Sequence, residues 1–248
     1  MNDATAGVSG APGAPSPVAR RGVFVAGTDT GVGKTFVSAG LAAALVRAGR
    51  RVAVMKPVAA GAVETADGLR NEDALALIAA ARSPAAYADV NPVCLPDPVS
   101  PHLAAARAGV HIELGPLRAA ASRLATGADF LLVEGAGGWR APIGDATTMA
   151  ELARELGLPV LLVVGLRLGC LNHAQLTHAA ILADGLRFAG WIGNVVEPEM
   201  AGLEANVEWL ARRIGEPFAL VPRCASGEPG AESLRDAFAT ASRCLEQL

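Results

Sequence analysis

A glycine-rich segment near the N-terminus, GTDTGVGKT at residues 27–35, constrains the fold more than any other part of the sequence. It follows the apolar run Gly22 to Ala26 and leads directly into a segment of helical period. Glycines at a strand-to-helix junction let backbone N–H groups turn inward around an anion, and the helix dipole favours the same charge. The segment therefore predicts a strand, a phosphate-binding loop and a helix, in that order.

The spacing of this loop departs from the usual phosphate-loop motif. The position five residues before Gly33 holds Thr28, and the first glycine, Gly27, comes one place earlier, so the loop is one residue longer. We expect Lys34 to reach the β- and γ-phosphates of a nucleotide and the Thr35 hydroxyl to bind Mg²⁺. A glycine-rich turn without a ligand is the alternative, disfavoured because strand, GKT and helix coincide. The residues predicted to bind the nucleotide here are Gly27, Thr28, Asp29, Thr30, Gly31, Val32, Gly33, Lys34 and Thr35.

Short apolar runs alternate with longer segments of helical period between residues 21 and 248, as in βαβ units with a buried parallel sheet. The predicted strands are Gly22 to Ala26, Arg51 to Met55, Phe130 to Glu134, Pro159 to Val164, Gly190 to Val195 and Phe218 to Val221. The predicted helices are Thr35 to Ala48, Glu72 to Ala81, Pro116 to Thr126, Thr148 to Leu156, Leu171 to Asp184, Leu203 to Ile214 and one from Glu232. This pattern predicts one α/β domain, residues 21–248, with a doubly wound, mainly parallel sheet and helices on both faces.

Two segments fall outside this alternation. Residues 1–20 are rich in Ala, Gly, Pro and Ser and lack the charged and apolar regions of a signal peptide, so we expect a disordered tail. Residues 83–115 hold five prolines and two short helical fragments. We expect this second segment to be an excursion from the sheet edge that could form one wall of a substrate pocket.

Charge and cysteine usage exclude several classes of function. The formal net charge is −3, and the basic residues are scattered, which argues against a nucleic-acid partner. The longest apolar run, residues 158–166, is far shorter than the roughly 20 residues that span a bilayer. The four cysteines form no C-x-x-C pair, so they indicate neither a zinc site nor a redox dithiol and favour a reduced, cytoplasmic setting.

Three charged side chains stand where they could face the phosphate loop. Glu134 ends the apolar strand FLLVE, and open α/β sheets bind ligands at the carboxyl ends of their strands. Lys56 follows another strand, and Pro57 keeps it out of a helical conformation, so it could stabilise a transferring phosphoryl group. Asp73 begins a predicted helix, where its position alone leaves a metal ligand and a first-turn acid equally open.

Seven sequence blocks, in this order, resemble the dethiobiotin synthetase family from residue 22 to about residue 222. They read GTDTGVGKT, KPVAAG, GLRNEDALAL, NPV with SPH, VEGAGGW, VVGLRLGCLNHAQLT and GWIGNVV. The resemblance implies a P-loop NTPase fold and a homodimeric enzyme of biotin biosynthesis. Such an enzyme converts 7,8-diaminopelargonic acid, CO₂ and ATP into dethiobiotin, ADP and phosphate, through a carbamate and a carbamic-phosphoric anhydride.

The resemblance also implies a role for individual residues. Thr35, Asp73 and Glu134 would hold Mg²⁺, and the residues flanking the carbamate and γ-phosphate would be Lys34, Lys56 and Thr30. Asn194 would read the adenine edge, with Pro222 beside it. The substrate carboxylate would bind backbone N–H groups at the start of a helix of the partner subunit, at Gly169, Cys170, Leu171 and Asn172.

Two positions depart from the family pattern. Ala60 stands where the family often has a serine near the carbamate, and Gly31 stands where some members carry an acid that contacts the substrate. Both departures concern how the substrate is held. Trp139 follows the GAGG block, where it could close the pocket or pack in the core.

Two other classes of P-loop protein compete with this interpretation. Switch ATPases of the partition or septum-placement type share such a sheet, but they often carry a lysine near the start of the loop, where this chain reads GTDTG. The C-terminal segment also has mixed charge rather than a basic amphipathic face for a membrane. Amide-forming ligases of the cobalamin pathway usually add a glutaminase domain, for which this chain has no room.

Overall fold

The computed structural model describes residues 17–19, 21–197, 199–223 and 230–247. The predicted disordered tail, residues 1–20, lies outside the described residues except for 17–19. No helix within the described ranges is long and apolar enough to cross a membrane.

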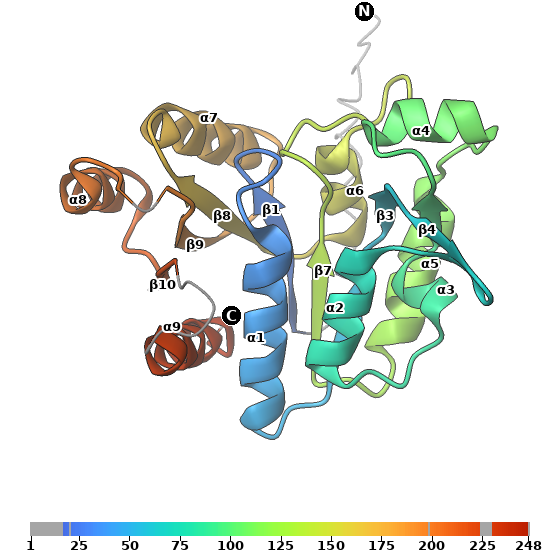
Figure 1. Cartoon of the computed structure of the whole chain (residues 1–248), viewed down its shortest axis with the longest axis horizontal. Helices are drawn as coiled ribbons and strands as arrows, with labels where there is room; N and C mark the ends of the chain where they lie inside the picture. The colour runs from blue at the N-terminus through green and yellow to red at the C-terminus, as the bar shows by residue number, and fades with distance from the viewer. Residues whose placement is uncertain (1–16, 20, 198, 224–229, 248) are drawn as a thin grey trace, which may run out of the picture.

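A six-stranded parallel sheet forms the centre of the molecule, in the order β10-β9-β8-β1-β7-β2 (Figure 1). Its strands are β1 (Gly22–Gly27), β2 (Val52–Met55), β7 (Phe130–Glu134), β8 (Val160–Leu166), β9 (Phe188–Val195) and β10 (Ala219–Val221). Every residue of β1, β2, β7 and β8 is buried, as expected of a parallel sheet covered on both faces. The six predicted strands are confirmed, and their ends differ from the prediction by no more than about two residues.

Helices cover both faces of this sheet. On one face α1 (Lys34–Arg47) packs between α2 (Glu72–Ala81) and α9 (Gly230–Leu245). On the other, α5 (Leu114–Ala125) packs with α6 (Met149–Leu156), and α7 (Cys170–Ala183) with α8 (Leu203–Ile214). The predicted helices are confirmed, and the doubly wound α/β architecture follows from them.

The segment between β2 and β7 departs furthest from simple βαβ alternation. It contains a parallel pair, β3 (Val58–Ala60) with β6 (Val93–Leu95), and an antiparallel pair, β4 (Val63–Thr65) with β5 (Gly68–Arg70). It also holds the two short helices α3 (Tyr87–Val90) and α4 (Pro101–Ala108), which match the predicted fragments. The four small strands were not predicted, because three residues are too few to show a period.

The carboxyl ends of the central strands bring the predicted site together. Val25 of β1 is paired with Glu134 of β7, so the strand that enters the phosphate loop lies beside the strand that ends in the acid. β2 lies on the other side of β7, with Met55 opposite Val133, and Lys56 follows directly. All these ends open on one edge of the sheet, where α/β proteins bind ligands.

Candidate active site

The phosphate loop has the backbone conformation that its glycines allow. Gly31 and Gly33 lie in the left-handed region, with φ of 74° and 85°. A Cβ on Gly33 would lie 2.2 Å from Asn194 Nδ2, which donates to the Val32 carbonyl at 2.9 Å. No side chain of the described residues caps the N-terminus of α1, so its first N–H groups are available to an anion.

Two of the predicted phosphate-binding residues use their backbone N–H groups elsewhere. Thr28 N–H donates to the Val163 carbonyl at 3.1 Å, and Thr30 N–H donates to Asp29 Oδ1 at 2.7 Å. The second oxygen of Asp29 accepts from Arg167 at 2.8 Å, which ties the loop to the segment before α7. These bonds hold the shape of the loop, and they leave phosphate contacts to the residues nearer α1.

Lys34 folds back over the loop, where its ammonium donates to the Asp29 carbonyl at 3.0 Å. Burial lowers the pKa of Lys34 to about 8, and the nearby charge of Lys56 acts in the same direction. A lysine whose pKa is lowered by burial and by a neighbouring cation favours an anionic ligand, because such a ligand offsets both effects.

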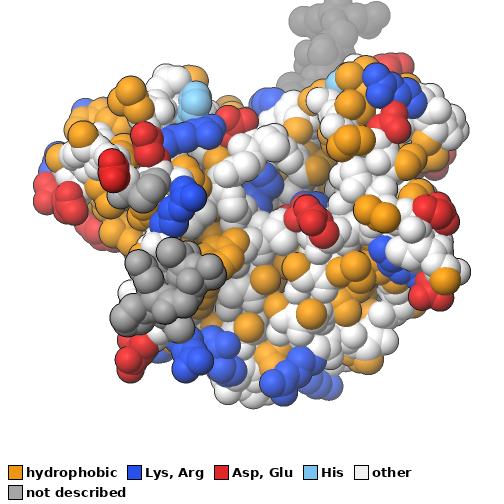
Figure 2. All heavy atoms as spheres, in the orientation of Figure 1, with side chains coloured by type: hydrophobic (Ala, Val, Ile, Leu, Met, Phe, Trp, Pro, Cys, Tyr) orange, Lys and Arg blue, Asp and Glu red, His pale blue; other side chains and the backbone are white. Residues whose placement is uncertain are grey.

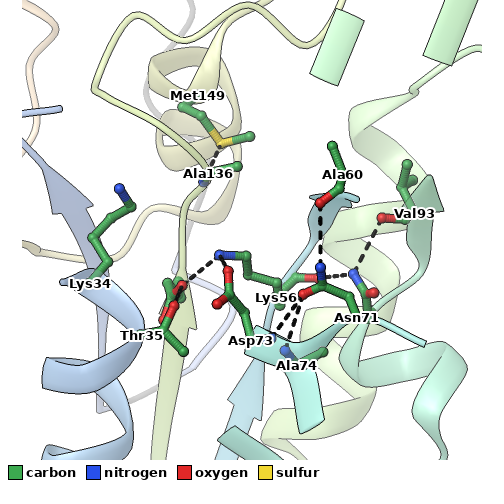
Figure 3. Close-up of polar contacts among 12 residues, drawn as sticks. Lys34, Thr35, Lys56, Ala60, Asn71, Asp73, Ala74, Val93, Ala136 and Met149 are labelled. Carbon is green, nitrogen blue, oxygen red and sulfur yellow. Dashed lines mark hydrogen bonds and ion pairs between the residues drawn. The ribbon is translucent and has the colours of Figure 1, made fainter. Parts of the chain in front are cut away.

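A cluster of four polar side chains, two of them buried, lies beside Lys34. Thr35 Oγ1 donates to Glu134 Oε1 at 2.8 Å, and the ammonium of Lys56 lies 2.5 Å from the same oxygen and 2.8 Å from Asp73 Oδ2 (Figure 3). The four side chains come from α1, the end of β7, the residue after β2 and the first turn of α2. Glu134 is completely buried and the side chain of Lys56 is only 5% exposed, whereas the side chain of Asp73 is 35% exposed, so the cluster is buried at the Lys56–Glu134 pair and open at Asp73.

The charges in this cluster stabilise one another. Burial alone would lower the pKa of Lys56, but the carboxylates of Glu134 and Asp73 outweigh it and raise the pKa. Burial would likewise raise the pKa of Asp73, but the Lys56 ammonium outweighs it and lowers the pKa. Lys56 and Asp73 therefore remain ionised at neutral pH.

The donor set of this cluster fits Mg²⁺. Glu134 Oε2 is buried and has no hydrogen-bond partner among the described residues. The Thr35 hydroxyl and the Asp73 carboxylate lie next to it, and oxygen donors of this kind are those that Mg²⁺ prefers. No group of three or more His, Cys, Asp or Glu side chains suited to a metal occurs in the described part of the chain.

A cavity of about 740 Å³ opens over the cluster. Figure 2 shows the hollow near the middle of this face, with basic and acidic side chains inside it. The predicted residues that line the cavity are Thr30, Gly31, Gly33, Lys34, Thr35, Lys56, Ala60, Asp73 and Glu134. One wall is formed by residues 98–101, as expected of the excursion after β2. The prediction missed Asn71, which also lines the cavity and could have been found as the N-cap before an apolar helical run.

A second cavity, of about 310 Å³, adjoins the phosphate loop at Gly31. Both residues predicted to contact the nucleotide base, Asn194 and Pro222, line this cavity. Asn194 is buried, and its amide nitrogen is already bonded to the Val32 carbonyl. Its carbonyl oxygen, as an acceptor, and its second N–H, as a donor, remain for a ligand.

The four residues predicted to bind the substrate carboxylate line neither of these cavities. Gly169 is the N-cap of α7, with φ of 94° and no side-chain cap from any described residue, and Cys170 is the first helical residue. Burial raises the pKa of the Cys170 thiol, so this cysteine is not a thiolate nucleophile. Within a single chain, the cavity over the cluster is therefore not lined by Gly169, Cys170, Leu171 or Asn172.

Trp139 proves to be a core residue rather than a lid. It is 4% exposed and its ring meets Phe24 edge to face, with ring centroids 6.4 Å apart. Its indole N–H donates to Asp184 Oδ2 at 2.7 Å, at the end of α7. Trp139 therefore anchors the segment after Glu134 against the helix layer.

The sequence is also similar to a known protein family. Residues 21–223 match the family model described as an AAA domain. The chain is 51% identical over 210 residues to the ATP-dependent dethiobiotin synthetase BioD of Pseudomonas paraeruginosa, covering 84% of this chain and 92% of that protein. It is also 51% identical over 218 residues to the protein of the same name from Aromatoleum aromaticum, covering 87% and 97%.

Among solved structures, the MinC:MinD cell division protein complex of Aquifex aeolicus superposes with a TM-score of 0.56 at 16% identity, covering 92% of this chain and 96% of that one. MinD from the same organism gives a TM-score of 0.55, also at 16% identity. At this level of identity the likeness shows a shared fold and no more.

Proposed function

Because this chain belongs to the family of ATP-dependent dethiobiotin synthetases, we propose that it carboxylates 7,8-diaminopelargonic acid and closes the ureido ring of dethiobiotin in biotin biosynthesis. ATP is consumed and ADP and phosphate are released. The observation that carries this proposal is the hydrogen-bonded cluster of Thr35, Glu134, Lys56 and Asp73 that lines a cavity beside a phosphate loop.

Mg²⁺ belongs to the proposal, with Thr35, Asp73 and Glu134 as the residues that would hold it. Bound there, the ion would neutralise charge on the β- and γ-phosphates. The free Oε2 atom of Glu134 supports this role, because a buried carboxylate oxygen without a partner is costly unless a cation or donor meets it.

The reaction needs three bond-forming events at one anionic site. One substrate amine attacks CO₂ and loses a proton to give a carbamate. A carbamate oxygen then attacks the γ-phosphorus, and ADP leaves. The second amine then attacks the carbamate carbon and expels phosphate, which closes the ring. Lys34 and Lys56, with Thr30 beside them, would hold the carbamate and the γ-phosphate together and offset the negative charge of the transfer.

The nucleotide base would occupy the smaller cavity next to Gly31. One N–H of the Asn194 amide is bonded within the protein, and its carbonyl oxygen would accept a hydrogen bond from the amino group of adenine. Pro222 lines the same cavity and would pack against the base. The phosphates would lie along residues 31–35, next to the N-terminus of α1.

We include a homodimer in the proposal, with the substrate site at its interface. The surface around α7 exposes three leucines, Leu168, Leu176 and Leu182, at 91%, 62% and 50%. Such an apolar surface favours burial against another chain. In the dimer the uncapped N-terminus of α7, from Gly169 to Asn172, would bind the substrate carboxylate in the partner's cavity.

A cytoplasmic setting and a single domain over residues 21–248 complete the proposal. The three cysteines within the described residues, Cys94, Cys170 and Cys244, are free thiols, which fits a reducing compartment. The substrates are small molecules, and neither nucleic acid nor a membrane takes part.

A partition-type switch ATPase is the second candidate, supported by the shared fold with MinD at 16% identity. Product analysis separates the two candidates. Purified protein with MgATP, bicarbonate and 7,8-diaminopelargonic acid should form dethiobiotin, ADP and phosphate in equal amounts, as measured by mass spectrometry and phosphate release. ADP release that ignores the diamine and rises with DNA or lipid vesicles would favour the switch.

A further inference from the structure

Tyr87 is the only tyrosine of the chain, and its hydroxyl lies between the two segments that carry Lys56 and Asp73. It accepts a hydrogen bond from the Asn71 backbone N–H at 2.7 Å and donates to Asn91 Oδ1 at 3.0 Å. The proposed chemistry does not use Asn71 or Asn91 directly. Each of these two asparagines, however, hydrogen-bonds to a residue that the chemistry does use, Asp73 or Lys56.

The first contact leads to Asp73. Asn71 is the N-cap of α2, and its side-chain oxygen accepts from the N–H groups of Asp73 and Ala74 at 3.1 and 3.3 Å. Figure 3 shows these bonds at the start of the helix. Asn71 is only 4% exposed, so its backbone N–H would be unsatisfied without the tyrosine oxygen. Tyr87 therefore holds the residue that fixes the first turn of α2.

The second contact leads to Lys56. The side-chain nitrogen of Asn91 donates to the Lys56 carbonyl at 2.6 Å and to the Val93 carbonyl at 3.2 Å. The Lys56 N–H in turn donates to the Val90 carbonyl at 2.8 Å. Asn91 is 2% exposed, so these bonds are made away from water. The backbone of Lys56 is thus held by the same short segment that carries Tyr87.

The ring of Tyr87 is held as well. The guanidinium of Arg70 lies 4.2 Å from the ring centroid. Burial raises the pKa of Tyr87 to about 12, so the phenol stays protonated and keeps its hydrogen bond to Asn91 throughout the physiological range. One further neighbour, Cys94 Sγ at 3.5 Å from the hydroxyl, leads to neither Lys56 nor Asp73.

We propose that Tyr87 is a positioning residue, whose hydroxyl sets the Lys56 ammonium and the Asp73 carboxylate at the separation that the metal and the transferring phosphoryl group require. The inference rests on the proposed function, because only that chemistry gives the pair a use. It follows from one hydroxyl bridging the start of α2 and the end of β2, two segments that the chain joins only through the β3, β4 and β5 strands. Groups that hydrogen-bond directly to a metal ligand commonly change metal affinity or activity by about 10–100-fold when altered. Tyr87 acts one contact further out, through Asn71 and Asn91.

The test compares Tyr87→Phe with Cys94→Ala. Tyr87→Phe removes the hydroxyl and keeps the ring that Arg70 contacts. Cys94→Ala removes a thiol that lies beside the same hydroxyl and leads to neither Lys56 nor Asp73. Dethiobiotin formation gives kcat and the KM for ATP, and calorimetric titration of Mg²⁺ in the presence of a non-hydrolysable ATP analogue gives metal affinity. All measurements are made at a temperature where circular dichroism shows each variant folded.

We expect Tyr87→Phe to lower kcat and weaken Mg²⁺ binding, each by up to about tenfold, the lower end of the effect of a direct partner of a metal ligand, with little change in the KM for ATP. Cys94→Ala should keep wild-type values. A Tyr87→Phe variant with wild-type kcat and Mg²⁺ affinity, one that only melts earlier, or one that never folds would overturn the proposal. Wild-type protein that makes no dethiobiotin would instead count against the proposed function, and the Mg²⁺ titration would still decide the role of Tyr87.

Discussion

The Lys56 ammonium lies 2.5 Å from a carboxylate oxygen of Glu134, and both side chains are almost completely buried. A buried pair of this kind gains little net stability, because desolvation of the two charges offsets their attraction. Removing one partner is costly, since it leaves the other charge buried and alone. The same oxygen of Glu134 accepts from Thr35, so the pair links the second strand to the phosphate loop.

Lys56→Ala should abolish most turnover while the protein still binds ATP. The variant loses a cation beside the transferring phosphoryl group but keeps the phosphate loop and Lys34. We expect kcat to fall by about two to three orders of magnitude, measured by dethiobiotin formation, with analogue binding measured by calorimetry. The unpaired Glu134 should also destabilise the fold by about 3–5 kcal/mol, measured by chemical denaturation.

Arg107→Ala is the matched control for Lys56→Ala. Arg107 pairs with Asp97 at 3.0 Å, but both side chains are well exposed, at 61% and 38%. Such a pair contributes about 0–1 kcal/mol, so turnover and stability should stay near wild type. Near-normal turnover in Lys56→Ala would remove Lys56 from the chemistry.

Glu134→Gln should weaken Mg²⁺ binding and also destabilise the fold, because the buried Lys56 ammonium loses a charged partner. The amide keeps the size of the side chain and can still accept from Thr35 and Lys56, but it removes the negative charge that a metal needs. We expect at least a tenfold loss of Mg²⁺ affinity, measured calorimetrically with an ATP analogue. Glu208→Gln, on an exposed face of α8, is the control. Unchanged Mg²⁺ affinity in Glu134→Gln would place the metal elsewhere.

Gly33→Ala should lose nucleotide binding and stability together. A methyl group there would lie 2.2 Å from Asn194 Nδ2, and the residue has φ of 85°. Gly49 has a similar φ of 82°, and a Cβ added there would have no described atom within 4 Å. Gly49→Ala therefore measures the backbone cost alone, about 1–2 kcal/mol. Nucleotide titration and thermal denaturation should show a larger loss for Gly33→Ala. Equal effects of the two substitutions would mean that the close approach of Asn194 does not matter.

Leu176→Glu should separate the proposed dimer. The leucine is 62% exposed on α7, and a charge there opposes burial against a second chain. Sedimentation should show monomers in which nucleotide binding is retained and the KM for the diamine is raised. Val110→Glu, at a position 41% exposed beyond α4, should keep the wild-type assembly. A wild-type protein that sediments as a monomer would refute the homodimer directly.

Local features of the sequence were enough to predict the sheet and the phosphate loop. The period of the apolar residues and the glycines between Gly27 and Gly33 act within a few residues, so strands, helices and the loop can be recognised without knowing what packs against them. Glu134 and Lys56 were placed near the loop by one general property, that the carboxyl ends of parallel strands share an edge.

The contacts inside the site were decided by tertiary structure alone. Glu134 contacts Thr35, which is 99 positions away in the sequence, and Lys56, which is 78 positions away. The position of Asp73 in the sequence left its role as a metal ligand open. Trp139 could have been a lid until its bond to Asp184 put it in the core, and Tyr87 carried no signal at all. The reason is physical: sequence periods specify which face of an element is apolar, but only packed elements determine which polar side chains meet. The phosphate loop could thus be read from the chain itself, whereas the charge cluster beside it exists only in the fold.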